Sequence, residues 1–171
     1  MKKIYSLILI SYIFALTGEN LVIQMDEKSK PANSTTKMNM LLTNKNGKTR
    51  NSIIHSIIKN NGEKQITWFL SPPDDKGIAF LKIEHKNKDD EMKIWLPAFK
   101  KIKRISTKKR SDSFMGSDIS YEDMSNRKKK EYDFKIIGQK NLNGSICHVL
   151  KSIPKEYVQS EYSHHHTWID T

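Results

Sequence analysis

KIWLPAFKKIKRISTKKRSDSFMGSDISYEDM, the stretch from Lys93 to Met124, carries the clearest structural signal in the chain. Its first part predicts a β-hairpin, because apolar residues recur at every second position from Met92 to Leu96, as in a strand with one buried face. Pro97 cannot donate a hydrogen bond to a neighbouring strand, so the first strand should end there. A second, basic strand then covers Lys101 to Ser106, and a polar loop follows from Ser111 to Asp118.

The rest of the chain repeats this β pattern. Glu19 to Lys28 has apolar residues at helical spacing and predicts one short helix. Asparagine–glycine pairs such as Asn46-Gly47 indicate hairpins, because a type I′ turn needs positive φ at both central positions. Short strands at hairpin spacing predict a mainly β domain, built as one antiparallel meander. The further expected strands cover Lys37–Thr43, Arg50–Lys59, Gln65–Leu70, Ile78–His85, Tyr132–Gly138, Ser145–Ile153 and Ser160–Ile169.

The first 18 residues read as a signal peptide for export. Two lysines precede an apolar run from Ile4 to Leu16, which is short for a membrane span and is followed by polar sequence. We expect cleavage after Gly18, with Ala15 as the alternative site and an uncleaved anchor as the competing interpretation. The single cysteine, Cys147, lies far from this leader, so we expect neither lipidation nor an internal disulfide.

The composition is basic, with a formal net charge of +11 at pH 7. Such a charge fits an anionic partner, such as nucleic acid, lipid headgroups or an acidic protein. A codon bias that enriches lysine, asparagine and isoleucine would raise the charge equally well, and lysine greatly outnumbers arginine here. Net charge alone therefore does not choose a partner.

Four segments resemble the outer-membrane lipoprotein-sorting family, the LolA/LolB-like periplasmic lipid carriers. They are FLSPPDDKGIAFLK (69–82), WLPAFKKIKRIS (95–106), RSDSFMGSD (110–118) and YEDM (121–124), and they occur in this order. The resemblance implies a LolA-like domain over residues 19–171, with a curved antiparallel sheet that forms a half-open β-barrel. It also implies a few short helices that cover the concave face of this sheet.

The same resemblance implies a function in the periplasm. An apolar cavity would shield the acyl chains of a lipid or lipoprotein, with no cofactor. Members of the family usually continue for several strands beyond the position of Thr171, so we expect the domain to be incomplete at its C-terminal end. The alternative function is a non-catalytic accessory module of an efflux-type exporter in the inner membrane, bound through the basic face of the chain.

Candidate ligand-binding residues follow from the alternation along the expected strands. We expect apolar faces to curve around one interior, with Phe114 and Met115 at its mouth as a plug or a gate. For the strand from Ile78 to His85 the choice of face stays open, because Ile78 and Phe80 compete with Leu81 and Ile83 for the interior. The candidate residues are Met38, Met40, Ile66, Trp68, Leu70, Leu81, Ile83, Met92, Ile94, Leu96, Phe114 and Met115.

Three more specific functions, namely metal binding, catalysis and nucleic-acid binding, have less support in the sequence. His164 and His166 share a strand face and could bind a metal, but no third ligand lies at an obvious spacing. No phosphate-binding loop, dinucleotide fingerprint or catalytic constellation is present, so we expect no enzymatic activity. Lys93 to Arg110 holds eight basic residues and no acid, but few aromatic residues for base stacking. With an export signal, this argues against nucleic acid and favours a solvated face, anionic headgroups or an acidic partner protein.

Overall fold

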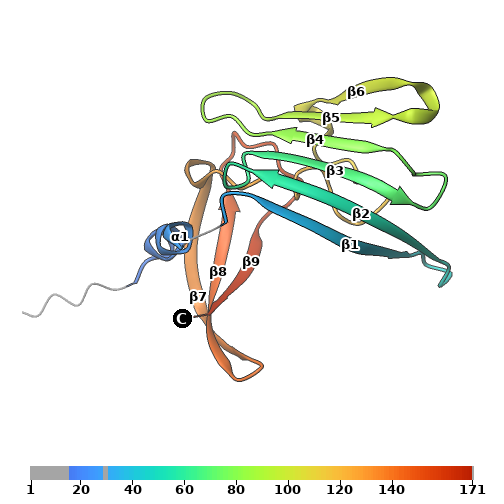
Figure 1. Ribbon diagram of the computed structural model, residues 1–171. Helices are drawn as coiled ribbons and strands as arrows, with labels where there is room; N and C mark the ends of the chain where they lie inside the picture. The colour runs from blue at the N-terminus through green and yellow to red at the C-terminus, as the bar shows by residue number, and fades with distance from the viewer. Residues whose placement is uncertain (1–15, 29–30, 171) are drawn as a thin grey trace, which may run out of the picture.

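The computed structural model describes residues 16–28 and 31–170, in which nine strands form two antiparallel sheets beside one α-helix (Figure 1). Six strands lie in chain order in the first sheet and three in the second. No helix within these residues is long and apolar enough to cross a membrane. The first sheet contains β1 (Ser34–Thr43), β2 (Thr49–Lys59), β3 (Lys64–Ser71), β4 (Ala79–Ile83), β5 (Glu91–Leu96) and β6 (Lys101–Ile105), and the second contains β7 (Tyr132–Leu142), β8 (Ser145–Pro154) and β9 (His165–Asp170).

Every expected strand is present, but the single meander is wrong, because the strands divide into two sheets. The linker between them, residues 106–131, contains the short 3-10 turns η2 (Thr107–Lys109) and η3 (Lys129–Glu131) and an isolated bridge between Ser113 and Ser120. The last strand also starts later than expected. Residues 160 and 161 bind the Glu122 side chain of the linker instead of joining a sheet, through Ser160 Oγ at 2.5 Å and the Glu161 amide at 3.3 Å.

Two asparagine–glycine turns differ in their backbone. Asn143 and Gly144 both have positive φ, as a two-residue hairpin turn requires. At the first hairpin only Gly47 does, and the Gly47 amide donates to the Asn44 carbonyl at 2.9 Å. The type I′ turn expected there is therefore wrong, because Asn44 closes a longer turn with its own side chain, which accepts from the amides of Asn46 and Lys48.

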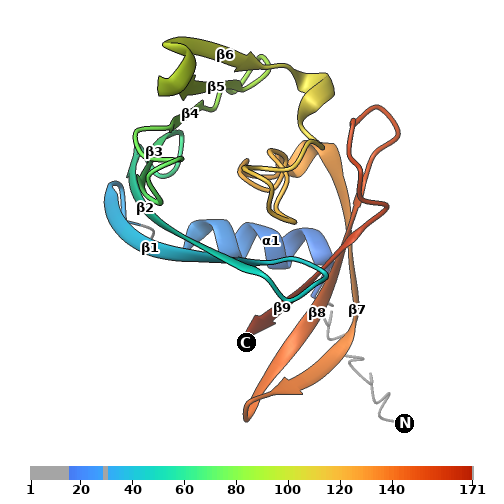
Figure 2. The same cartoon turned by 90° about the vertical axis from the view of Figure 1, so that its right-hand side faces the viewer.

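The main core lies on the concave side of the first sheet, where the linker folds back (Figure 2). Phe80 is fully buried, and Phe69 and Met92 are each 1% exposed. From the linker, Phe114 and Tyr121 join the same cluster. The Phe114 ring meets the rings of Phe80 and Tyr121 edge to face, with centroids 5.3 and 5.7 Å apart. Burial, with the Asp112 carboxylate nearby, raises the pKa of Tyr121, so its phenol stays neutral.

Two carboxylates in the β4–β5 connection hold the ends of the linker. The Asp90 side chain is 2% exposed and pairs with Arg110 at 3.3 Å and with Lys128 at 3.1 Å. Glu84 accepts from the backbone and side-chain amides of Asn126, both at 3.0 Å, and from the buried Lys82 ammonium at 2.6 Å. The linker is therefore tied by charge at both ends and by aromatic packing in its middle.

The helix α1 (Gly18–Glu27) packs on the second sheet. Thr17 caps it, because the Thr17 Oγ1 accepts from the Asn20 amide at 3.1 Å. Leu21 lies with Leu150 and Ile169 in a smaller core. At Gly18 the helix approaches β7 so closely that a Cβ would lie 2.6 Å from a backbone carbonyl, so only glycine fits. Most of the expected signal peptide, residues 1–15, lies outside the described residues.

We predict that Phe80→Ala lowers the free energy of unfolding by about 3–5 kcal/mol, because it removes a fully buried ring from the aromatic cluster. Phe99→Ala is the matched control, since Phe99 is 75% exposed and should cost less than about 0.5 kcal/mol. Urea unfolding of both variants measures the difference. Similar losses in the two variants would contradict this description of the core.

We predict that Asp90→Asn costs about 1–3 kcal/mol of stability, because it leaves two cations without their buried carboxylate. Asp74→Asn, at an exposed position of the β3–β4 turn, should be near neutral. Hydrogen exchange should also become faster in the linker of the Asp90 variant. Unchanged exchange there would show that this carboxylate does not hold the linker.

We predict that His165 makes a pH-dependent contribution to folding stability. Burial and the nearby Arg127 lower the pKa of its imidazole. A neutral His165 Nδ1 can accept from Arg127 Nη2 at 3.1 Å, whereas a protonated ring cannot. Because the folded-state pKa lies below that of the unfolded chain, this contribution is complete above about pH 6.5 and is lost as the pH falls. The stability difference between wild type and His165→Gln should shrink between pH 7 and pH 5. Parallel stability curves would refute the contribution.

Candidate functional site

Four partly buried apolar side chains surround the main core. Met40, Leu96, Met115 and Met124 pack against the buried cluster but stay only partly buried, and we call them the methionine rim. Met38, two residues before Met40 on the same face of β1, is 46% exposed. Methionine is flexible and polarizable, so each of these three side chains can adapt to an apolar partner.

The loop at residues 110–118 presents Phe114 and Met115 to this surface through its own hydrogen bonds. Met115 and Gly116 have positive φ, which turns the chain sharply after Phe114. The Ser117 Oγ donates to the Phe114 carbonyl at 2.6 Å, and the Ser113 Oγ donates to the Ser117 carbonyl at 2.5 Å. The serines of the motif therefore close the turn locally, while Phe114, 3% exposed, enters the core.

Seven of the twelve sequence-predicted site residues lie on the concave side. Met92 and Ile94 are fully within the core, at 1% and 4% exposure, and Phe114 joins them from the loop. The remaining four are partly buried against the core or exposed beside it. They are Met38, Met40, Leu96 and Met115.

The expectation of one shared interior is wrong for the other five residues. Phe80 is paired with Thr67 on the concave side, so the adjacent residues of both strands face the convex side. Both faces of β3 and β4 carry apolar residues, and alternation alone therefore could not choose between them. The residues on the convex side are Ile66, Trp68, Leu81 and Ile83, while Leu70 lies at an irregularity in the β2–β3 register and is 42% exposed.

Sequence reasoning missed several residues of the site. Met124 of the rim lies in the YEDM segment, which was noted only for its resemblance to a family. Tyr121 from the same segment and Phe69 from β3 lie in the buried cluster and were not expected there. Phe80, for which alternation left the choice of face open, lies in the same cluster. The linker has no strand or helix periodicity, and only its unexplained aromatic residues could have indicated a packed segment.

Other candidate sites of the described chain lie away from the methionine rim. An open pocket of about 570 Å³ is lined by charged and polar residues, including Asp89, Lys108, Arg110 and Tyr157. His164 and His166 lie side by side, with ring centroids 4.8 Å apart, as their shared strand face predicted. Within the described residues no group of three or more His, Cys, Asp or Glu side chains could hold a metal ion.

Comparisons with known proteins give a family model and similar solved structures. A family model described as an uncharacterized "-like" protein matches residues 61–171. No curated protein matches the chain. The chain is 29% identical to an outer membrane lipoprotein-sorting protein domain from Vibrio parahaemolyticus, with a TM-score of 0.82 over 90% of this chain and 66% of that one.

Two further solved structures have the same architecture. A DUF1329 family protein from Desulfovibrio piger is 29% identical, with a TM-score of 0.81 over 90% of this chain and 67% of that one. A LolA superfamily protein from Nitrosomonas europaea is 16% identical and shares the fold, with a TM-score of 0.63 over 91% of this chain and 67% of that one. This chain spans about two thirds of the length of each of these structures. The family model covers most of the chain, and with these neighbours it shows that the chain belongs to the LolA-like family.

Proposed function

We propose that this protein is a carrier that shields the acyl chains of a lipid or lipoprotein on the concave side of its first sheet. The observation that carries the proposal is the methionine rim, four partly buried apolar side chains that pack against an aromatic core. The likeness to an outer membrane lipoprotein-sorting domain supports it. The site needs no covalent chemistry, because burial contributes about 0.8 kcal/mol for each CH₂ group.

Binding requires room, and the linker is the element that can provide it. Phe114 and Tyr121 fill the concave side but belong to a segment without regular secondary structure. If residues 111–125 move outward, the rings of Phe69 and Phe80 become the floor of an apolar trough. The polar ties at Asp90 and Glu84 then act as anchors on either side of the moving segment.

The proposal places the protein in the periplasm, exported by the expected N-terminal signal peptide. A LolA-like fold and an apolar ligand support this location, since a carrier for acyl chains is useful where lipids cross an aqueous space. The domain boundaries at residues 18 and 19, and an association with an exporter, stay predictions.

We predict that Met40→Lys weakens binding of a fluorescent long-chain fatty acid by at least about tenfold, because it places a charge within the apolar rim. Leu41→Lys is the matched control, since the next residue of β1 points to the other face and is 64% exposed. Titration of the purified chain with the fluorescent ligand measures both affinities.

Two results would count against the carrier function. If Met40→Lys and Leu41→Lys bound the fatty acid with equal affinity, the rim would not be the binding surface. The carrier function would be contradicted if the wild-type chain bound no acyl probe. A cooperative unfolding transition would show that the chain tested is folded.

A further inference from the structure

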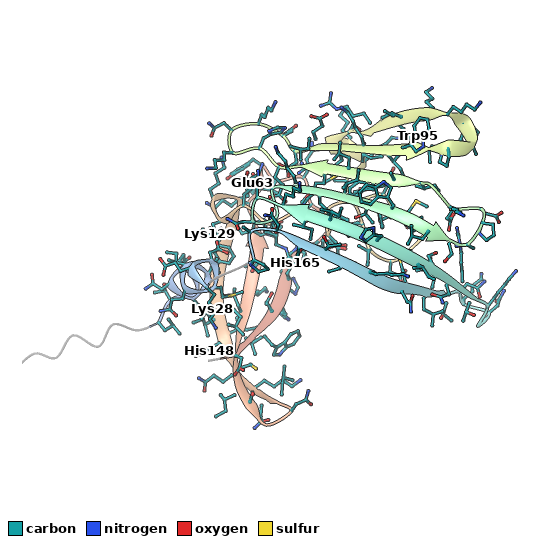
Figure 3. All side chains as sticks on the ribbon, viewed as in Figure 1. Lys28, Glu63, Trp95, Lys129, His148 and His165 are labelled. Carbon is teal, nitrogen blue, oxygen red and sulfur yellow. The ribbon has the colours of Figure 1, made fainter. Side chains whose placement is uncertain are left out.

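The β5–β6 hairpin exposes three large apolar side chains. Trp95 is 37% exposed, Ile102 is 60% exposed, and Phe99 is 75% exposed. Trp95 and Ile102 are cross-strand partners, so their side chains are neighbours on the convex face. Phe99 ends η1 (Pro97–Phe99), the turn that joins the two strands, and Figure 3 shows Trp95 on this hairpin. With the basic residues Lys100 and Arg104, these three form what we call the hairpin surface.

The charge around this surface is positive. From Lys93 to Arg110 the chain has eight basic residues and no acidic one. Arg104 lies opposite Lys93 on the convex face, and Lys93 pairs with Glu91. Lys93 and, more weakly, Arg104 lower the pKa of the Glu91 carboxyl. The adjacent β3–β4 turn adds no net charge, because the exposed Asp74 and Lys76 offset each other and Asp75 pairs with Arg50.

Protection of a sheet edge explains only part of this pattern. β6 is the last strand of the first sheet, and lysines on such a strand discourage pairing with other chains. That accounts for Lys101 and Lys103. It does not account for Phe99 and Ile102, because exposed apolar residues at an edge favour association. Basic and aromatic side chains together are the combination found where proteins meet the surface of a lipid bilayer.

We propose that the hairpin surface docks on an anionic phospholipid bilayer. The Trp95, Phe99 and Ile102 side chains enter the interfacial layer, and Lys100 and Arg104 contact lipid phosphates. The turn suits this contact, since the exposed Phe99 and the left-handed Lys100 follow each other where β5 and β6 are joined. This inference goes beyond the proposed function, because docking requires no ligand on the concave side.

The test is co-sedimentation of the purified full chain with vesicles of phosphatidylglycerol and phosphatidylethanolamine, beside vesicles of phosphatidylcholine alone. We expect binding to the anionic vesicles that weakens as salt is added. Phe99→Ser with Ile102→Ser, and separately Lys100→Gln with Arg104→Gln, should each reduce binding by at least about tenfold. Leu41→Ser, at an exposed apolar position of β1, should bind as the wild type does.

Two controls keep the outcomes distinct. Thermal unfolding of each variant checks that these exposed substitutions leave the fold intact. Met40→Lys should still sediment with anionic vesicles even though it loses fatty-acid binding, so docking and the carrier function can fail separately. Equal binding by wild type and hairpin variants, or equal binding to neutral vesicles, would overturn the proposal. So would binding only to bacterial membranes that contain proteins, which would indicate a protein partner.

Discussion

The packing of the linker against the concave side of the first sheet is the constraint on which the rest of the structure depends. Phe114 and Tyr121 supply aromatic rings that the strands need as partners, because a curved sheet cannot bury its own inner face. Without this packing Phe69 and Phe80 would face water, and the methionine rim would have no floor.

The alternation of apolar residues along the strands predicted most of the fold, whereas the sequence of the linker predicted little of it. Alternation located each strand, for example β5 at Glu91–Leu96, because one-sided burial leaves a period of two in the sequence. Alternation could not show that the strands divide into two sheets, because the path of the chain after Lys109 depends on packing between residues far apart in the sequence. It also misplaced Trp68 and Leu81, because their strands carry apolar residues on both faces.

The two proposed activities, ligand binding and membrane docking, belong to two different surfaces of the protein. The concave side combines a rigid aromatic floor with three flexible methionines, an arrangement suited to chains of variable length. The convex side of the β5–β6 hairpin combines exposed aromatic and basic side chains, an arrangement suited to a charged interface. Because the two surfaces lie on opposite faces of one sheet, one protein could hold a ligand and meet a membrane at the same time.

The most direct measurement of the central claim is NMR of methyl-labelled methionine during titration with a long-chain fatty acid. The methyl signals of Met40, Met115 and Met124 should shift together and saturate, because these residues form the rim. Met25, which packs in the separate core beneath α1, should stay unchanged and serves as the internal reference. Saturable shifts at Met25 without shifts at the rim, or no shifts at any methionine, would contradict an acyl-binding site on the concave side.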